Sequence, residues 1–351
     1  MTRGTRRFLV GSSVVVMVGL ATGLVAYYNG NLTFARASAG PAELAYLPPE
    51  TTGVAFANVR EIMSSAFVQK IRALIPADEL GTAKAELQAQ IGVDIERDID
   101  TVCAGVIGTS GATSGGVVMI RGRFNETSIE ALVTQHGGKV ENYKGKRLIT
   151  HPEFANIGEG LAVHGDGLNM TPEKTTGALA FFEPGLVAIG DMATVKKAID
   201  SAASRQNVTS NDELMSFVLD AERTGNAWSV GRFDAVANNP DIPAEIKQHI
   251  PPLKWVSASA KFDAGITGNV RADAVDDKSA EDLRAIVNGG LAAARLMGGQ
   301  EPQVEAMLSA LQVTGTGKTV KVAFTISPEL IDKLLAMAGG GGAAARRQFG
   351  R

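Results

Sequence analysis

Near its N-terminus the chain carries an uncharged stretch long enough to cross a membrane. Residues 8–28, FLVGSSVVVMVGLATGLVAYY, form a run of 21 residues without a charged side chain. At about 1.5 Å per residue, a helix of this length spans a hydrocarbon core of roughly 30 Å. We therefore predict a membrane anchor, and the residues expected to contact lipid are Phe8, Leu9, Val14, Val15, Val16, Met17, Leu20, Leu24, Val25, Tyr27 and Tyr28.

The charges around this segment predict its orientation. Arg3, Arg6 and Arg7 precede it, whereas the first charge after it is Arg36. Because positive charges stay on the cytoplasmic side of a membrane segment, the N-terminus, residues 1–7, should lie in the cytoplasm. We expect a single-pass protein of the cytoplasmic membrane whose body is extracytoplasmic, in the periplasm.

A cleaved signal peptide is the alternative interpretation of the same segment. Residues 35–37 and 37–39, Ala-Arg-Ala and Ala-Ser-Ala, have the small residues that signal peptidases accept, so the body could be secreted after cleavage near Ala39. The apolar run is longer than a usual signal-peptide core of about 7–15 residues, which favours retention as an anchor. No cysteine stands just after the run, so a lipid-modified N-terminus of the bacterial lipoprotein kind is not expected.

Length and composition indicate a globular body with more than one unit. The 351 residues are 45% hydrophobic and 20% charged, and a chain of this size commonly forms about two compact units. We predict a spacer at 29–45, a first lobe at 46–204, a second lobe at 205–337, and a glycine-rich basic tail at 338–351. The net charge of −3 gives no basic surface for nucleic acid, which we do not expect as a partner.

The body repeats a unit in which a strand or hairpin precedes a helix with a polar start. Expected strands are 54–59, one around Cys103, 116–124, 178–182, 186–190, 255–262, 268–275, 310–314 and 319–326. Expected helices are 60–75, 78–91, 128–135, one capped by Asp191, and others starting at Asn211, Ser279 and Ser327. Residues 137–145 are interpreted as a loop. We therefore predict an α+β fold of two similar lobes, each an antiparallel sheet with helices packed on one face.

Few residues suggest chemistry. Cys103 is the single cysteine, and its apolar surroundings predict a buried, inert thiol. The four histidines lack metal-site spacing; His151 and His164, with Glu153, Glu159 and Asp166, form the one group that could converge on a cation, although an exposed polar loop is the favoured interpretation. We predict no catalytic residue, metal or cofactor.

Residues 315–319, Gly-Thr-Gly-Lys-Thr, look like the end of a phosphate-binding loop. The full motif needs a glycine where Gln312 stands, and it leads into a helix. Here the alternating residues 319–326 predict a strand, so the segment is interpreted as a hairpin turn.

The anchor, the opening Leu-Pro-Pro-Glu-Thr at 47–51, and the strand and helix that start at Val54 together resemble uncharacterised bacterial cell-envelope proteins of the domain-of-unknown-function kind. The resemblance extends over about residues 8–200. It implies an envelope location and repeated α+β units, and it brings no catalytic residues.

These patterns favour a tethered binding, scaffold or assembly protein without catalytic activity. Its partners would be the membrane, through the anchor, and another envelope protein or an apolar ligand. A carrier of a lipid or similar ligand between sheet and helices is the alternative, and a hydrolase of envelope polymers, using Glu153, Glu159 and Asp166, is less favoured.

Overall fold

The fold is that of a computed structural model, which describes residues 40–73, 94–108, 115–152, 154, 176–233, 250–298 and 308–332. The predicted anchor at 8–28, the arginines Arg3, Arg6 and Arg7, the predicted helix at 78–91 and the basic tail lie outside the described residues. Within the described parts, no helix combines the length and the apolar character that a membrane crossing requires.

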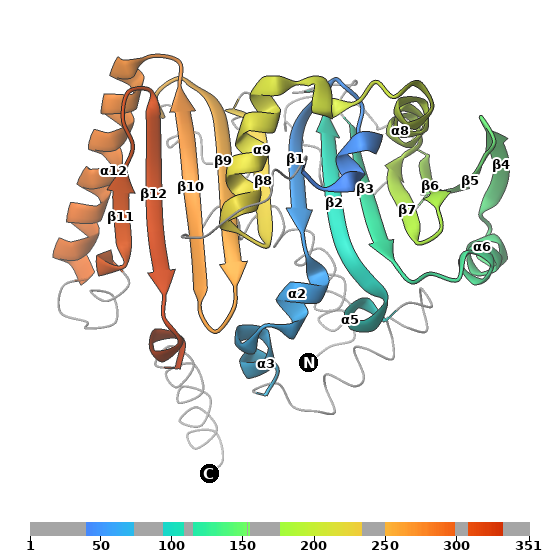
Figure 1. Cartoon of the computed structure of the whole chain (residues 1–351), viewed down its shortest axis with the longest axis horizontal. Helices are drawn as coiled ribbons and strands as arrows, with labels where there is room; N and C mark the ends of the chain where they lie inside the picture. Colours follow the sequence, from blue (N-terminus) through green and yellow to red (C-terminus); the bar gives the residue numbers. More distant parts are fainter. Residues whose placement is uncertain are drawn as a thin grey trace, which may run out of the picture.

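The described residues form one antiparallel sheet of twelve strands (Figure 1). The strand order across it is β11-β12-β10-β9-β8-β1-β2-β3-β7-β6-β5-β4. The strands are β1 Thr51–Ala57, β2 Ile99–Ile107, β3 Gly115–Gly122, β4 Lys139–Tyr143, β5 Lys146–His151, β6 Gly177–Glu183, β7 Leu186–Asp191, β8 Ala227–Arg232, β9 Leu253–Phe262, β10 Ile266–Ala274, β11 Leu311–Thr314 and β12 Thr319–Ile326. The predicted α+β class with antiparallel strands is confirmed.

The pair β1 and β8 joins the two halves of this sheet. Val54 lies opposite Val230 in an antiparallel register, and the strands of each half follow outward from this pair. On one side the order is β8-β9-β10-β12-β11; on the other it is β1-β2-β3-β5-β4 with the hairpin β6–β7 inserted between β3 and β5. The two predicted lobes therefore share a continuous sheet.

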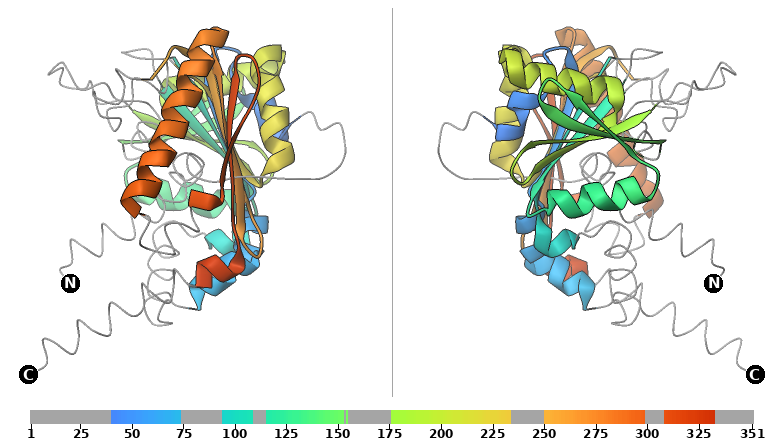
Figure 2. Two further views of the ribbon diagram at one scale, coloured as in Figure 1. Left: turned by 90° about the vertical axis from the view of Figure 1, so that its left-hand side faces the viewer. Right: turned by 90° about the vertical axis from the view of Figure 1, so that its right-hand side faces the viewer.

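Helices cover both faces of the sheet (Figure 2), so the prediction of helices on one face is wrong. The front face, as we call it, packs against η2, α8 and α9; the back face packs against α6 and α12. The helices are η2 Ala42–Tyr46, α2 Val59–Ser64, α3 Ala66–Arg72, α5 Ile95–Asp98, α6 Glu126–Gln135, α8 Met192–Ser204, η3 Val208–Ser210, α9 Asp212–Thr224 and α12 Asp277–Gly298.

Helices cover both faces of the sheet because the inner strands are apolar on both sides. In β3, Val117 and Met119 belong to the front core, while Val118 between them packs with Ala55 and Ala104 on the back. All three β3 residues are at most 1% exposed. A continuous apolar run of this kind must be covered on both faces, unlike an alternating strand with one wet side.

Local start and stop signals explain where several helices differ from expectation. The helix predicted at 60–75 breaks at Ser65, whose hydroxyl caps α3 by accepting from the Val68 amide at 3.3 Å. Asp191 caps α8 as predicted, accepting from the Thr194 amide at 2.8 Å. The last long helix, α12, begins two residues before Ser279, because Asp276 accepts from the Ser279 amide at 2.7 Å.

Residues 137–145, predicted as a loop, contain strand β4 and its two-residue turn to β5. The turn residues Lys144 and Gly145 have φ angles of 50° and 80°, which is the two-residue geometry typical of a tight hairpin. The sequence prediction missed β4 because its residues are exposed and mostly polar. Strands are recognised by alternating apolar residues, and only a strand with a buried face has them.

Candidate functional site

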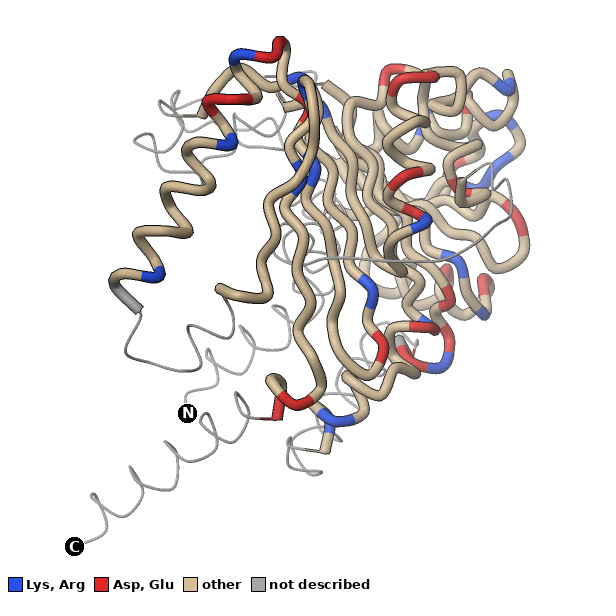
Figure 3. The backbone as a smooth tube through the Cα atoms, turned by 60° about the vertical axis from the view of Figure 1, so that its left-hand side comes forward, with Lys and Arg blue, Asp and Glu red and all other residues tan. Residues whose placement is uncertain are grey.

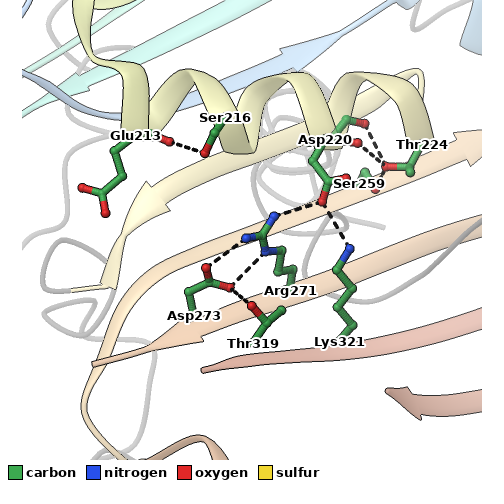
Figure 4. Close-up of polar contacts among 10 residues, drawn as sticks. Glu213, Ser216, Asp220, Thr224, Ser259, Arg271, Asp273, Thr319 and Lys321 are labelled. Carbon is green, nitrogen blue, oxygen red and sulfur yellow. Dashed lines mark hydrogen bonds and ion pairs between the residues drawn. The ribbon is translucent and has the colours of Figure 1, made fainter. Parts of the chain in front are cut away.

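Beyond α9, the front face of the sheet carries charged side chains on its outer strands. Helix α9 packs on β8 and β9, and in Figure 1 the strands β10 and β12 continue past it. Figure 4 shows the side chains on this uncovered part of the front face. They are Arg271 and Asp273 of β10 and Thr319 and Lys321 of β12, which Asp220 of α9 contacts from the helix. We call these five residues the polar cluster.

Arg271 is the centre of the polar cluster. Its Nε and Nη2 donate to the two carboxylate oxygens of Asp273 at 3.0 and 2.9 Å, and its Nη1 donates to Asp220 at 3.2 Å. The guanidinium also lies 4.2 Å from the ring centroid of Phe217, which is itself stacked on Trp255. A planar guanidinium suits this combination of a bidentate carboxylate and an aromatic face.

The remaining members of the polar cluster complete its charge balance. Lys321 donates to the same Asp220 oxygen at 3.3 Å, and the Thr319 hydroxyl donates to Asp273 at 3.0 Å. Burial alone lowers the pKa of Arg271, but its bonds to Asp273 and Asp220 outweigh burial and raise it. Two cations and two anions thus satisfy one another. The polar cluster therefore fixes α9 on the outer strands.

A second charged network joins η2 to the sheet. Glu43, 3% exposed, accepts hydrogen bonds from Arg121 and from the Thr101 hydroxyl, and Arg121 also pairs with Glu183 at 3.0 Å. Burial first, and then the neighbouring Glu183, raise the pKa of Tyr46. Because each charge in this network has a partner, the network holds η2 against the sheet.

Unlike these two charged networks, the outward side of α12 has few charged side chains. From residue 285 to 294 the helix has no charged side chain, and Figure 3 shows this stretch of the helix in tan between the charged residues toward its two ends. Ile286 is 48% exposed and Leu296 is 88% exposed. An ordinary surface helix is polar on its outer face, so this apolar outer side is unusual. We call residues 285–294 together with Leu296 the α12 patch; the charged Arg295 lies between them.

The residues singled out from the sequence have different fates. Cys103 is fully buried in β2, and burial together with Glu43 raises the pKa of its thiol well above the usual value, which agrees with an inert cysteine. Glu153, Glu159, His164 and Asp166 lie outside the described residues. Within the described ranges no three His, Cys, Asp or Glu side chains gather as metal ligands would.

His151 and the glycine turn of the supposed phosphate loop can be placed. The Nε2 of His151 lies 3.2 Å from the carbonyl oxygen of His136, and its ring contacts Phe154. Gly315 and Gly317 have positive φ angles, the antiparallel strands β11 and β12 flank them, and Lys318 donates to the Val275 carbonyl. The hairpin interpretation of this segment is confirmed.

The sequence reasoning missed the polar cluster and the α12 patch. Arg271 and Asp273 alternate along one strand, which places them on the same face, but their partner Asp220 is 51 residues away. The α12 patch had a local signal, because a ten-residue uncharged stretch inside a helix is visible in the sequence.

The fold and these surfaces define an α+β protein built on one large antiparallel sheet. No family model matches the chain, and no curated protein does. Among solved structures it is similar to TP0453 in crystal form I, with a TM-score of 0.43, 9% identity, and coverage of 86% of this chain and 98% of that one. TP0453 in crystal form III gives a TM-score of 0.42, 10% identity, and coverage of 86% and 100%.

Proposed function

We propose that this chain is a membrane-tethered, extracytoplasmic binding or scaffold protein with no catalytic role. The observation that carries the proposal is the α12 patch. A helix that is apolar on its outer side as well as toward its own sheet is normally covered, and large exposed apolar surfaces mark interaction sites.

The arrangement of α12 supports this role. Its first turns hold it to the sheet: Ala280 and Leu283 pack with Ala274 and Val320, and Arg284 donates to the Gly317 and Thr319 carbonyls. The exposed Ile286 and Leu296 follow on the same helix. A helix fixed at its base and apolar farther along can present a surface to a partner without losing its own fold.

The tether and the compartment rest on the sequence, on the uncharged segment at 8–28 and on the arginines that precede it. Sequencing the N-terminus of the mature protein tests this part. An intact N-terminus in the membrane fraction agrees with an anchor, whereas a start near residue 40 contradicts the tether and agrees with secretion.

Site-specific photo-crosslinking in intact membranes tests the binding role. A photoreactive residue in place of Leu296 should give one reproducible protein adduct, and the same residue in place of Lys278, on the charged first turn, should not. Both side chains are highly exposed, at 88% and 83%, so exposure alone cannot explain a difference. Adducts to lipid alone would favour the carrier of an apolar ligand, and equal labelling at both positions would contradict the proposal.

A further inference from the structure

Strand β4 forms one end of the twelve-stranded sheet, at the right of Figure 1. Among the described strands it pairs with β5 alone. The outer edge of such a strand presents backbone N–H and C=O groups to its surroundings, and these groups are a template for pairing with another chain.

The hairpin geometry decides which residues of β4 offer these groups. In a two-residue hairpin the flanking residues, here Tyr143 and Lys146, form a hydrogen-bonded pair, and bonded and non-bonded pairs then alternate along the strands. The backbone N–H and C=O groups of Glu141 and Lys139 therefore form hydrogen bonds with β5. The backbone groups of Val140 and Asn142 point away from it, toward the free edge.

We propose that β4 pairs with β4 of a second copy of this chain, antiparallel, with Val140 opposite Val140 of the second copy. In this register Lys139 of each copy lies opposite Glu141 of the other, so two ion pairs form across the joint. These are non-hydrogen-bonded pairs, whose Cα atoms approach to about 4.5 Å and whose side chains are closest.

Other registers lack this complementarity. Centring the pair on Glu141 would place two carboxylates directly opposite each other, which is destabilising. Centring it on Asn142 would place Val140 opposite Lys144 and Glu141 opposite Tyr143, with no ion pair. At the other end of the sheet, β11 has no charged residue between Leu311 and Thr314, so charges cannot select a register there.

Side-chain packing favours the same register. Val140 is 42% exposed and lies opposite the fully buried Ile149, which packs with Ile129 and Val133 of α6. Two valines side by side would extend this apolar layer across the joint. On the front face, Glu141 already pairs with Lys196 of α8 at 3.0 Å, so it is held where Lys139 of the second copy would meet it.

Disulfide trapping of the full chain in detergent tests the register. In this register the two copies of residue 140 form a hydrogen-bonded pair, whose Cα atoms lie about 5.5 Å apart, within disulfide range. Val140→Cys should therefore give a disulfide dimer under mild oxidation. Asn142→Cys is the matched control: in this register its two copies are offset by four residues, about 13 Å, and should not cross-link. Cys103 is buried, so the wild type should remain uncross-linked. A monomeric Val140→Cys variant, or equal trapping of both variants, would overturn the proposal.

A charge-complementation experiment tests the ion pairs. In the Val140→Cys background, Lys139→Glu and Glu141→Lys each place like charges across the joint, so each variant alone should lose at least tenfold in cross-linking yield. An equimolar mixture of the two should recover it as a mixed dimer, because opposite charges again face each other at both pairs. Unchanged thermal midpoints show that each variant is folded. If the folded variants cross-link alone, or if their mixture does not recover the dimer, the proposed register is wrong.

Discussion

Asp220 on α9 and Arg271 on β10 are joined by a hydrogen bond of 3.2 Å between a carboxylate oxygen and Nη1. This contact connects a front-face helix to a strand that the helix does not cover, and it places the guanidinium over the Phe217 ring of the same helix. The polar cluster is thus a tie between helix and sheet at the point where the apolar front core ends.

Removing the arginine should therefore weaken the whole second half of the sheet. Arg271→Ala leaves Asp273 without its bidentate partner and removes the contact with Phe217, so we expect a loss of about 2–3 kcal/mol in the free energy of unfolding. Lys278→Ala, which removes only an exposed i,i+4 pair with Asp282, should change it by less than about 0.5 kcal/mol. Urea unfolding of both variants measures the difference, and equal losses would contradict a special role for the polar cluster.

The cap of α12 should make stability depend on pH. The hydrogen bond from the Ser279 amide lowers the pKa of Asp276, so its carboxylate stabilises the folded state above the unfolded-state pKa, and this contribution is lost as the pH falls through the folded-state value. Asp276→Ala should be less stable than the wild type at pH 7. The difference should shrink below about pH 4, where Asp carboxyls become protonated. Unfolding curves at a series of pH values from pH 7 downward test this; a difference that stays constant over the whole acid range would show that the charge of the cap is not its source.

The thiol of Cys103 should react only when the chain unfolds. It has no exposed surface, and burial and Glu43 raise its pKa, so the reactive thiolate is scarce. We expect labelling by a chromogenic thiol reagent at pH 8 to be at least tenfold slower in the native protein than in denaturant. Equal rates would mean that β2 opens readily, and would also remove the wild-type control in the disulfide experiment.

Local patterns predicted much of this fold, and contacts distant in sequence account for what they missed. The hairpin of β6 and β7 and the turn at residues 315–317 follow from glycines and alternating residues within a few positions. The continuity of the sheet depends on the pairing of Val54 with Val230, and no local sequence pattern predicts that pairing. The same holds for the polar cluster, because Asp220 and Arg271 look like two ordinary surface charges until the sheet brings them together.

Two glycines provide a final test of how tightly the inner sheet is packed. A Cβ on Gly190 of β7 would lie 2.2 Å from the Gly116 carbonyl oxygen, a backbone atom that cannot turn aside, whereas a Cβ on Gly289 of α12 would meet nothing within 4 Å. Gly190→Ala should therefore lower the free energy of unfolding by at least about 2 kcal/mol. Gly289→Ala should raise it by up to about 1 kcal/mol, because alanine favours the helix. Urea unfolding measures both. A neutral Gly190→Ala would mean that β3 and β7 can separate at this point, and a destabilising Gly289→Ala would mean that the added Cβ meets a neighbour at this position of α12.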